Sequence, residues 1–201
     1  MEATESKRLV VGISGASGAI LGIELLKAMS GMPGWETHLV ISNGARRTIT
    51  LETSNTLEEV EALATRHHPI EDVGALVASG TFKTAGMVVV PCSMKTVAGI
   101  ATGYSDNLLL RAADVTIKER RKLVLVARES PLSPVHLRNL QAVSDLGGII
   151  LPPMLTYYNH PSTIEDMTRH IVGKILNVFD LELPHFQRWG DELSVKPSDH
   201  V

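Results

Sequence analysis

The sequence predicts one α/β domain built on a doubly wound parallel sheet, Rossmann-like or flavodoxin-like, with helices on both faces. Apolar runs rich in β-branched residues recur along the chain, and they are continuous rather than alternating, as is typical of strands covered on both faces. Segments of helical character separate these runs, as crossovers between parallel strands require. With 201 residues, 44% of them apolar, the chain can bury one full core. We therefore expect a single domain over residues 1–201, with tails at 1–7 and 191–201 that are flexible or contact other subunits.

Each expected strand ends where the composition changes. A glycine-rich turn follows LVVGI, SNG follows THLVI, CSMKT follows MVVVP, an Arg-Glu pair follows LVLVA, and GGIILPP ends in two prolines. The expected strands are residues 9–13, 37–41, 87–91, 123–127 and 147–153. The expected helices are residues 18–30, 43–66 with a break, 94–102, 107–121, 133–146 and 162–178. Because ligands of open parallel sheets bind beyond the carboxyl ends of the strands, we expect the functional residues along one rim.

Composition narrows the classes of function. The formal net charge of -3 and the pI near 6.2 give the protein no overall positive potential that would attract nucleic acid, so we expect no nucleic-acid partner. With one cysteine, no leader-like start and no 18-residue apolar run, a cytoplasmic protein without a membrane segment is expected. The histidines lack metal-ligand spacing, and the adjacent His67 and His68 are expected to diverge on a helix, so no metal site is expected.

The stretch GISGASGAILG, residues 12–22, is a candidate anion-binding turn between the first strand and the first helix. Its glycines allow close approach of the backbone, and free N–H groups at a helix start attract an anion. No acidic residue ends the second strand, where a dinucleotide-binding fold would place one, so a mononucleotide is favoured over NAD. A glycine turn required only for packing is the alternative.

The stretch PCSMKT repeats this pattern after the third strand. Ser93 and Thr96 could cap a helix and present hydroxyl and N–H groups to a ligand, although a plain N-cap would look the same. Cys92 is interpreted as a small buried residue, because no nearby histidine would activate it as a nucleophile.

Charged residues near the fourth strand are further candidates. Arg111, Asp114 and Lys118 share one helical face, which is ordinarily a solvated, ion-paired face. Arg128 and Glu129 stand directly at a strand end, where an arginine suits a phosphate or a carboxylate.

Three further residues have both a plain and a functional interpretation. Glu52 ends the helical segment after Ser42 and would by default be a surface carboxylate. Tyr158 lies in TYYNHP and could donate a hydrogen bond to a phosphate oxygen. Lys174 on the last helix would by default be solvent-exposed.

Four stretches, taken together, resemble the UbiX family of flavin prenyltransferases, some members of which are named as subunits of aromatic or hydroxyaryl acid decarboxylases. They are GISGASGA, ASGTFKTAGMVVVPCSMKT, DNLLLRAADVTIKERRKLVLVARESPLSPVHL and YNHP, in the family's order and spacing. The likeness runs from about residue 8 to residue 190.

The resemblance implies prenylation of reduced FMN by dimethylallyl phosphate. Bonds form between flavin N5 and C1′ and between flavin C6 and C3′, and the product serves a UbiD-like decarboxylase. The resemblance also implies a homo-dodecamer with sites at subunit junctions.

The resemblance assigns roles to individual residues as well. The residues implied to hold FMN are Gly15, Ala16, Ser17, Ser42, Ser93, Met94, Lys95, Thr96 and Arg128. The residues implied to bind the prenyl donor are Tyr158, Lys174, Arg128, Arg111, Trp189 with its aromatic face, and Lys118 from a neighbouring subunit. The residues implied in catalysis are Glu52 as the acid-base group, Glu129 at the second acidic position, and Ser17.

Three segments depart from the family pattern, at four positions. Lys174 stands where arginine is more usual. Lysine keeps the positive charge but cannot make the two parallel hydrogen bonds of a guanidinium. Leu155 and Tyr157 change the segment beside the prenyl pocket, and Ala127 replaces a proline.

Two other functions remain to be distinguished. A flavin-dependent cysteine decarboxylase would need an early catalytic histidine and a PxMNxxMW-like segment, neither of which is visible. A non-catalytic FMN-binding accessory subunit of an aromatic acid decarboxylase would not need Glu52, Tyr158 and Lys174.

Overall fold

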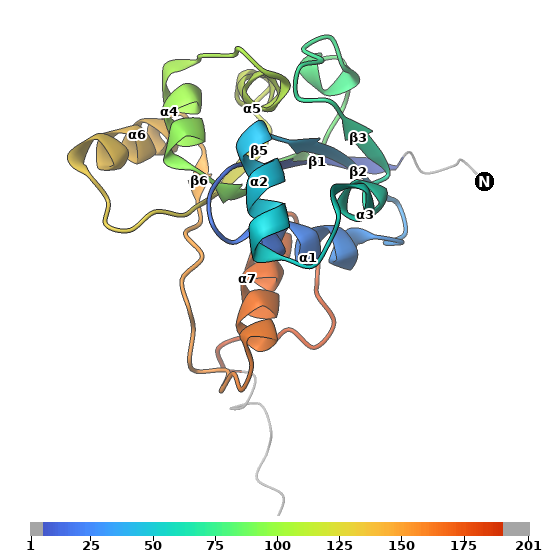
Figure 1. Cartoon of the computed structure of the whole chain (residues 1–201), viewed down its shortest axis with the longest axis vertical. Helices are drawn as coiled ribbons and strands as arrows, with labels where there is room; N and C mark the ends of the chain where they lie inside the picture. Colours follow the sequence, from blue (N-terminus) through green and yellow to red (C-terminus); the bar gives the residue numbers. More distant parts are fainter. Residues whose placement is uncertain (1–5, 191–201) are drawn as a thin grey trace, which may run out of the picture. The chain divides into compact units, whose positions relative to one another are not determined.

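The computed structural model describes residues 6–190, so the predicted tail at 191–201 and most of the one at 1–7 lie outside the described residues. The chain divides into two compact units, Met1–Pro153 and Met154–Val201. Figure 1 gives the order of the elements along the chain.

The first unit contains a wholly parallel six-stranded sheet in the order β3-β2-β1-β4-β5-β6. The strands are β1 Lys7–Ile13, β2 Trp35–Ile41, β3 Arg66–His68, β4 Gly86–Cys92, β5 Lys122–Ala127 and β6 Ile149–Ile150. Chain order reverses direction across the sheet between β1 and β4, so the predicted doubly wound α/β class is confirmed.

The helices of this unit lie close to the predicted ranges. They are α1 Ala19–Met29, α2 Asn43–Glu52, α3 Leu57–Ala62, α4 Met94–Thr102, α5 Leu108–Lys118, α6 Pro134–Asp145 and the short 3₁₀ helix η1 Leu76–Ala78. The predicted break in 43–66 separates α2 from α3. The predicted strand 147–153 is reduced to the two residues of β6, and η1 was not predicted.

The expectation that His67 and His68 lie on a helix is wrong. Both belong to β3, which pairs with β2 through His38, Leu39 and Val40. Three residues, two of them histidines, are too few and too polar to produce a strand pattern in the sequence. The side chain of His68 is instead held by His38, since its Nε2 lies 2.9 Å from His38 Nδ1.

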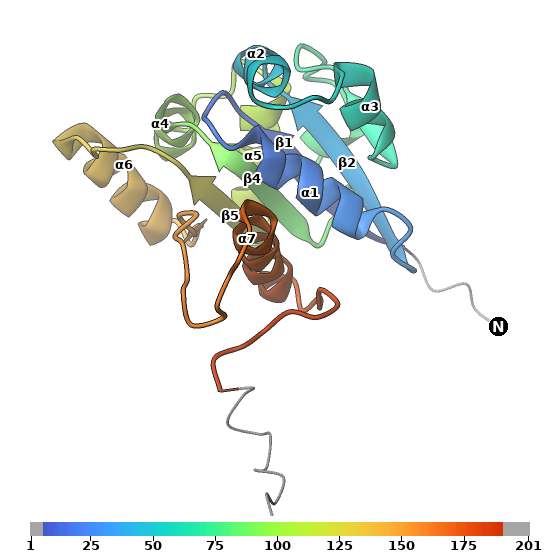
Figure 2. The same cartoon turned by 60° about the horizontal axis from the view of Figure 1, so that its bottom comes forward.

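The two faces of the sheet are covered by different helices, as the predicted layering requires (Figure 2). Helix α1 packs so closely on one face that a Cβ at Gly22 would lie 2.6 Å from the Val90 carbonyl oxygen. Helices α4, α5 and α6 cover the other face, where side chains such as Met87, Val97 and Leu109 form one buried cluster.

The second unit is organised around α7, Ile164–Val178. Thr163 caps its start and Asp166 accepts the Thr163 backbone N–H in return, which makes a capping box. The chain returns alongside the helix, where Phe186 packs over Gly173; a Cβ there would lie 2.2 Å from the Phe186 ring.

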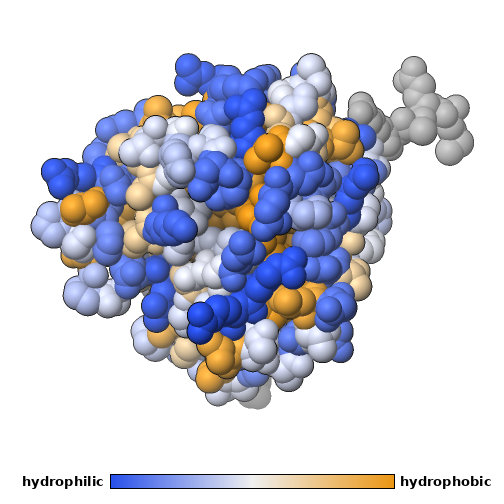
Figure 3. Space-filling model, turned by 45° about the horizontal axis from the view of Figure 1, so that its top comes forward, coloured by the Kyte–Doolittle hydropathy of each residue, from blue (hydrophilic) through white to orange (hydrophobic). Residues whose placement is uncertain are grey.

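Among residues 6–190, no helix is long and apolar enough to cross a membrane. The face drawn in Figure 3 carries hydrophilic residues interspersed with smaller apolar areas. Within the same range, no group of three or more His, Cys, Asp or Glu side chains is arranged to hold a metal ion.

Candidate functional site

The carboxyl ends of β1, β2 and β4 each lead into the start of a helix, so the N-termini of α1, α2 and α4 lie along one rim of the sheet. Unpaired N–H groups and the helix dipoles make such a rim favourable for an anion. This is the rim on which the sequence predicted the functional residues.

Ser14 ties the ends of β1 and β4 together. Its buried hydroxyl donates to the Pro91 carbonyl at 3.1 Å and accepts the Ser93 N–H at 2.8 Å. The Ser14 N–H also donates to the Pro91 carbonyl. The glycine-rich turn and the PCSMKT stretch are therefore held in one fixed arrangement.

Gly15 and Gly44 bring the first turn against the start of α2. A Cβ on Gly15 would lie 3.0 Å from the backbone of Gly44, and a Cβ on Gly44 would lie 3.2 Å from Gly15 Cα. A side chain at either position would push the two backbones apart, so these glycines are needed for a close approach at the rim.

The N-terminus of α1 is occupied by the carboxylate of Glu52. Gly18, the N-cap of α1, has a positive φ of 103° and offers no side chain of its own. Glu52 Oε2 accepts the Gly18 N–H at 2.8 Å and the Ala19 N–H at 3.1 Å. The first turn thus does bind an anion, and in this chain that anion is a side chain from the end of α2.

The pKa of Glu52 lies below its ordinary value. Burial opposes ionisation, but hydrogen bonds from the Gly18 N–H, the Ser17 hydroxyl and the Ala19 N–H, together with the charge of Arg128, outweigh it. Glu52 is therefore a carboxylate at neutral pH, hydrogen-bonded by Ser17 and stabilised by the charge of Arg128.

Ser42 and Ser93 are the N-caps of α2 and α4. Ser42 Oγ accepts the Ala45 N–H at 3.1 Å, and Ser93 Oγ lies 3.1 Å from Thr96 Oγ1 and accepts the Thr96 N–H. The capping interpretation of the PCSMKT stretch is thus correct, and a cap leaves the rest of each helix start open to a ligand.

The other residues predicted for this rim differ in exposure. Arg128 follows β5 with an exposed side chain, and its N–H donates to the Cys92 carbonyl at 3.1 Å. Lys95 is exposed, whereas Ala16 and Met94 are buried. Cys92 is fully buried, and burial raises the pKa of its thiol, which agrees with an inert core residue.

Arg111, Lys118 and Glu129 are engaged locally. Arg111 forms an ion pair with Asp114 at 2.7 Å, as the spacing of the helical face predicted. The Lys118 ammonium contacts Glu119 at the C-terminal end of α5. Because β5 begins only four residues after Lys118, this contact lies near the amino ends of the strands, opposite the rim. Glu129 accepts the N–H of Ser130 at 3.0 Å.

The second unit groups Tyr158 and Trp189. Their ring centroids lie 5.3 Å apart in an edge-to-face arrangement. The Tyr158 hydroxyl lies 3.4 Å from His170 Nε2, and Lys174 is exposed on α7 one turn beyond His170.

Sequence reasoning missed two contributors, Gly44 and His170. Each acts through a contact distant in sequence, Gly44 against Gly15 and His170 against Tyr158. The four-residue spacing of His170 and Lys174 was the one available signal for the histidine, because it places both on one side of a helix.

Comparison with known proteins gives a consistent result. Residues 1–178 match the family model described as Flavoprotein. A probable UbiX-like flavin prenyltransferase from Sedimentibacter hydroxybenzoicus is 56% identical over 182 residues, which cover 90% of this chain and 96% of that protein.

Two solved structures are similar at the level of fold and sequence. A dodecameric FMN-dependent UbiX-like decarboxylase from Escherichia coli O157:H7 has a TM-score of 0.89 and 52% identity, covering 90% of this chain and 98% of the other. AnUbiX in complex with FMN and dimethylallyl pyrophosphate has a TM-score of 0.89 and 49% identity, covering 92% and 97%.

Proposed function

The chain belongs to the UbiX-like flavin prenyltransferases, and on that premise we propose which of its residues carry the reaction. The enzyme joins the dimethylallyl group of dimethylallyl phosphate to reduced FMN. Bonds form from N5 and C6 of the flavin to C1′ and C3′ of the donor, and the bond between C1′ and the phosphate oxygen breaks. The N5 and C6 protons are lost, and C2′ takes up one proton as the allylic double bond is consumed. The flavin supplies the two nucleophilic atoms, and the protein supplies binding, orientation and proton transfer.

FMN is held by the rim of the first unit. This assignment is supported by the convergent starts of α1, α2 and α4, by the close Gly15–Gly44 approach, and by the exposed guanidinium of Arg128. Since Glu52 already occupies the Gly18 and Ala19 amides, the flavin phosphate is expected at the starts of α2 and α4 instead. The residues proposed to hold FMN are Gly15, Ala16, Ser17, Ser42, Ser93, Met94, Lys95, Thr96 and Arg128.

The prenyl donor is bound by Tyr158 and Lys174. Donors gathered on the departing phosphate stabilise the charge that develops on it. Trp189, edge-to-face with Tyr158, supplies an aromatic face for the allyl group. Lys118 is proposed to act on the site of a neighbouring subunit, which agrees with its position opposite the rim of its own sheet. Arg111 is proposed as a further donor-binding residue.

Glu52 is the proposed acid-base group. It is ionised and so can accept the proton released from the flavin, and its hydrogen bonds from Gly18 and Ala19 hold it in one position. Ser17 hydrogen-bonds Glu52 and is proposed to assist it. Glu129 is proposed as a second acidic group at the same rim.

We further propose the setting in which the enzyme works. It assembles as a homo-dodecamer, as the Escherichia coli O157:H7 relative does, with each site completed at a subunit junction. It is cytoplasmic and passes prenylated FMN to a UbiD-like decarboxylase.

The Glu52 carboxylate at the start of α1 carries this proposal, because it caps the helix and also presents an ionised proton acceptor, hydrogen-bonded by Ser17, which flavin storage alone would not require. The test is anaerobic incubation of the protein with reduced FMN and dimethylallyl phosphate, followed by mass analysis of the extracted flavin. A flavin heavier by one dimethylallyl group is expected. Recovery of unmodified FMN, with the diphosphate donor as well, would instead indicate the accessory role.

A further inference from the structure

His170 lies between two aromatic side chains of the second unit. One ring face stacks on Phe186, with centroids 5.1 Å apart and planes inclined by 27°. Its Nε2 lies 3.4 Å from the Tyr158 hydroxyl, and the Tyr158 ring meets it edge-on at 5.5 Å. The imidazole is therefore oriented by packing, with its Nε2 directed at the Tyr158 hydroxyl.

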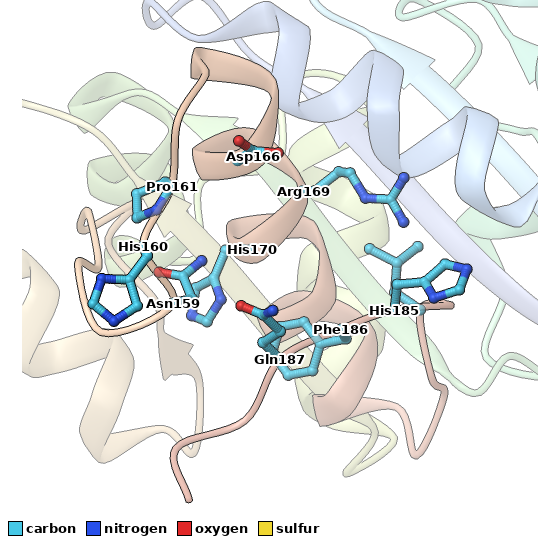
Figure 4. A pocket seen from close by; sticks show the side chains of 10 residues that line it. Asn159, His160, Pro161, Asp166, Arg169, His170, His185, Phe186 and Gln187 are labelled. Atoms are coloured by element: carbon cyan, nitrogen blue, oxygen red, sulfur yellow. The ribbon is translucent and has the colours of Figure 1, made fainter. Parts of the chain in front are cut away.

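The stacking partner of His170 is itself fixed by the helix. Gly173 lies one turn from His170 and has no side chain, so Phe186 rests directly against α7. Figure 4 shows His170 projecting from α7 toward the segment that carries Phe186 and Gln187, while Arg169 projects to the other side of the same helix. Gly173 and Phe186 thus hold the imidazole in a defined orientation.

The imidazole of His170 is neutral at neutral pH. Burial lowers its pKa, and the charge of Lys174 one turn along α7 lowers it further. A neutral imidazole has one N–H and one acceptor nitrogen. If Nε2 carries the hydrogen, it donates to the Tyr158 oxygen, and the phenol must then direct its own O–H elsewhere.

We propose that His170 is a positioning residue for the prenyl donor: its Nε2–H donates to the Tyr158 oxygen and so turns the phenol O–H toward the donor phosphate. The proposal rests on the proposed role of Tyr158 in binding that phosphate. The long contact of 3.4 Å is expected to shorten when the donor binds, as polar contacts of substrate-free sites often do. Lys174 then supplies the charge and Tyr158 a directed hydrogen bond to the same phosphate.

The test compares His170→Phe, which keeps a ring for Phe186 to stack on, with His170→Gln, which keeps an N–H donor. His170→Phe is expected to raise KM for dimethylallyl phosphate about three- to tenfold, the fold-change of one lost hydrogen bond, with FMN affinity unchanged. His170→Gln is expected to keep KM within about threefold of the wild type. The matched control is His185→Asn, an exposed histidine at a positive φ that asparagine tolerates.

A double-mutant cycle isolates the route through Tyr158. In a Tyr158→Phe background, His170→Phe is expected to cause no further rise in KM, because the hydroxyl that it orients is gone. If His170→Phe is not recovered folded, His170→Asn, whose side chain is too short to reach Tyr158, takes its place.

Two results would overturn the proposal: a wild-type KM in the folded His170→Phe variant (or in His170→Asn where it takes its place), or an equal rise in KM in both the wild-type and Tyr158→Phe backgrounds. A Tyr158→Phe enzyme with wild-type KM would contradict the proposed donor site itself, so the two failures are distinguishable.

Discussion

Glu52 shows how one side chain can complete a helix and remain available for chemistry. Its Oε2 accepts hydrogen bonds from both backbone N–H groups at the start of α1. Without Glu52 these groups would have no side-chain partner, because the N-cap is glycine. The same contacts keep it ionised. A carboxylate held as an anion beside exposed Ser17 is suited to accept a proton.

Glu52→Gln should separate these two roles. The amide oxygen can still accept from Gly18 and Ala19, so folding and FMN binding should change little, while proton acceptance is lost. Formation of the four-ring product is expected to slow about 100-fold or more, measured by mass analysis of quenched anaerobic reactions. Wild-type turnover in this variant would show that Glu52 only caps α1.

Substitutions of Lys174 test whether binding of the donor phosphate needs only a positive charge or also the two parallel hydrogen bonds that an arginine guanidinium can make. Lys174→Ala should raise KM for dimethylallyl phosphate and lower turnover with nearly constant FMN affinity, while Lys174→Arg should keep most activity. Steady-state kinetics with flavin binding measured in parallel provide the comparison. Lys27→Ala, at an exposed lysine on α1 paired with Glu24, is the control. Normal kinetics in Lys174→Ala would make Lys174 an ordinary surface residue.

Helix α1 owes its position on the sheet to the absence of a side chain at Gly22. A Cβ there would lie 2.6 Å from the Val90 carbonyl oxygen and 3.0 Å from Ile13 Cδ1. The Ile13 side chain could move away from an added Cβ, but the Val90 carbonyl belongs to β4, whose backbone is held by hydrogen bonds to β1 and β5. The approach therefore sets the distance between α1 and the rim that its N-terminus helps to form.

Gly22→Ala is expected to destabilise the protein by about 1–3 kcal/mol, because overpacking outweighs the helix propensity that alanine gains. Urea unfolding followed by circular dichroism measures this. Glu24→Ala on the same helix, which loses only an exposed ion pair, should stay within about 0.5 kcal/mol of the wild type. A Gly22→Ala protein as stable as that control would mean that α1 can shift without cost.

At the scale of the first unit, a buried pair of histidines between β2 and β3 makes the stability of the fold depend on pH. His38 contacts His68 at 2.9 Å and meets the Phe82 ring edge-on at 5.0 Å, and its Nε2 has no hydrogen-bond partner among the described residues. Burial, and then the neighbouring His68, lower the pKa of His38 to about 4, despite the nearby carboxylate of Glu36.

The sign of the pH dependence follows from where protons bind. In the unfolded chain His38 takes up a proton near pH 6.5, whereas in the folded protein it does so only near pH 4. Between these values the unfolded state binds more protons, so the free energy of unfolding should fall as pH is lowered from 6.5 toward 4, by at most about 1.4 kcal/mol per pH unit for this group.

Urea titrations at pH 7 and pH 5 measure this slope in the wild type and in His38→Gln. The variant should show a smaller loss between the two pH values, whatever its stability at pH 7. His160→Asn, at an exposed histidine, should keep the wild-type slope. An unchanged slope in His38→Gln would place the acid sensitivity elsewhere.

The fold class and the rim could be predicted from the sequence alone. Continuous apolar runs at β1, β2, β4 and β5 bury both faces of a strand, and this requirement is visible locally without any knowledge of the partners. The composition changes after these runs located Ser17, Ser42, Ser93 and Arg128 at one edge, because parallel strands all end on the same side. The family motifs added the reaction and the proposed residue roles.

Which groups come into contact could be seen only in the folded protein. The strand β3 exists because β2 offers it an edge, and its own three residues carry no strand pattern. The contacts of Glu52 with Gly18, of Gly15 with Gly44 and of Tyr158 with His170 join residues 12 to 34 positions apart. Contacts of this kind depend on how the packed elements are placed, and periodicity along a sequence reports only which face of each element is buried.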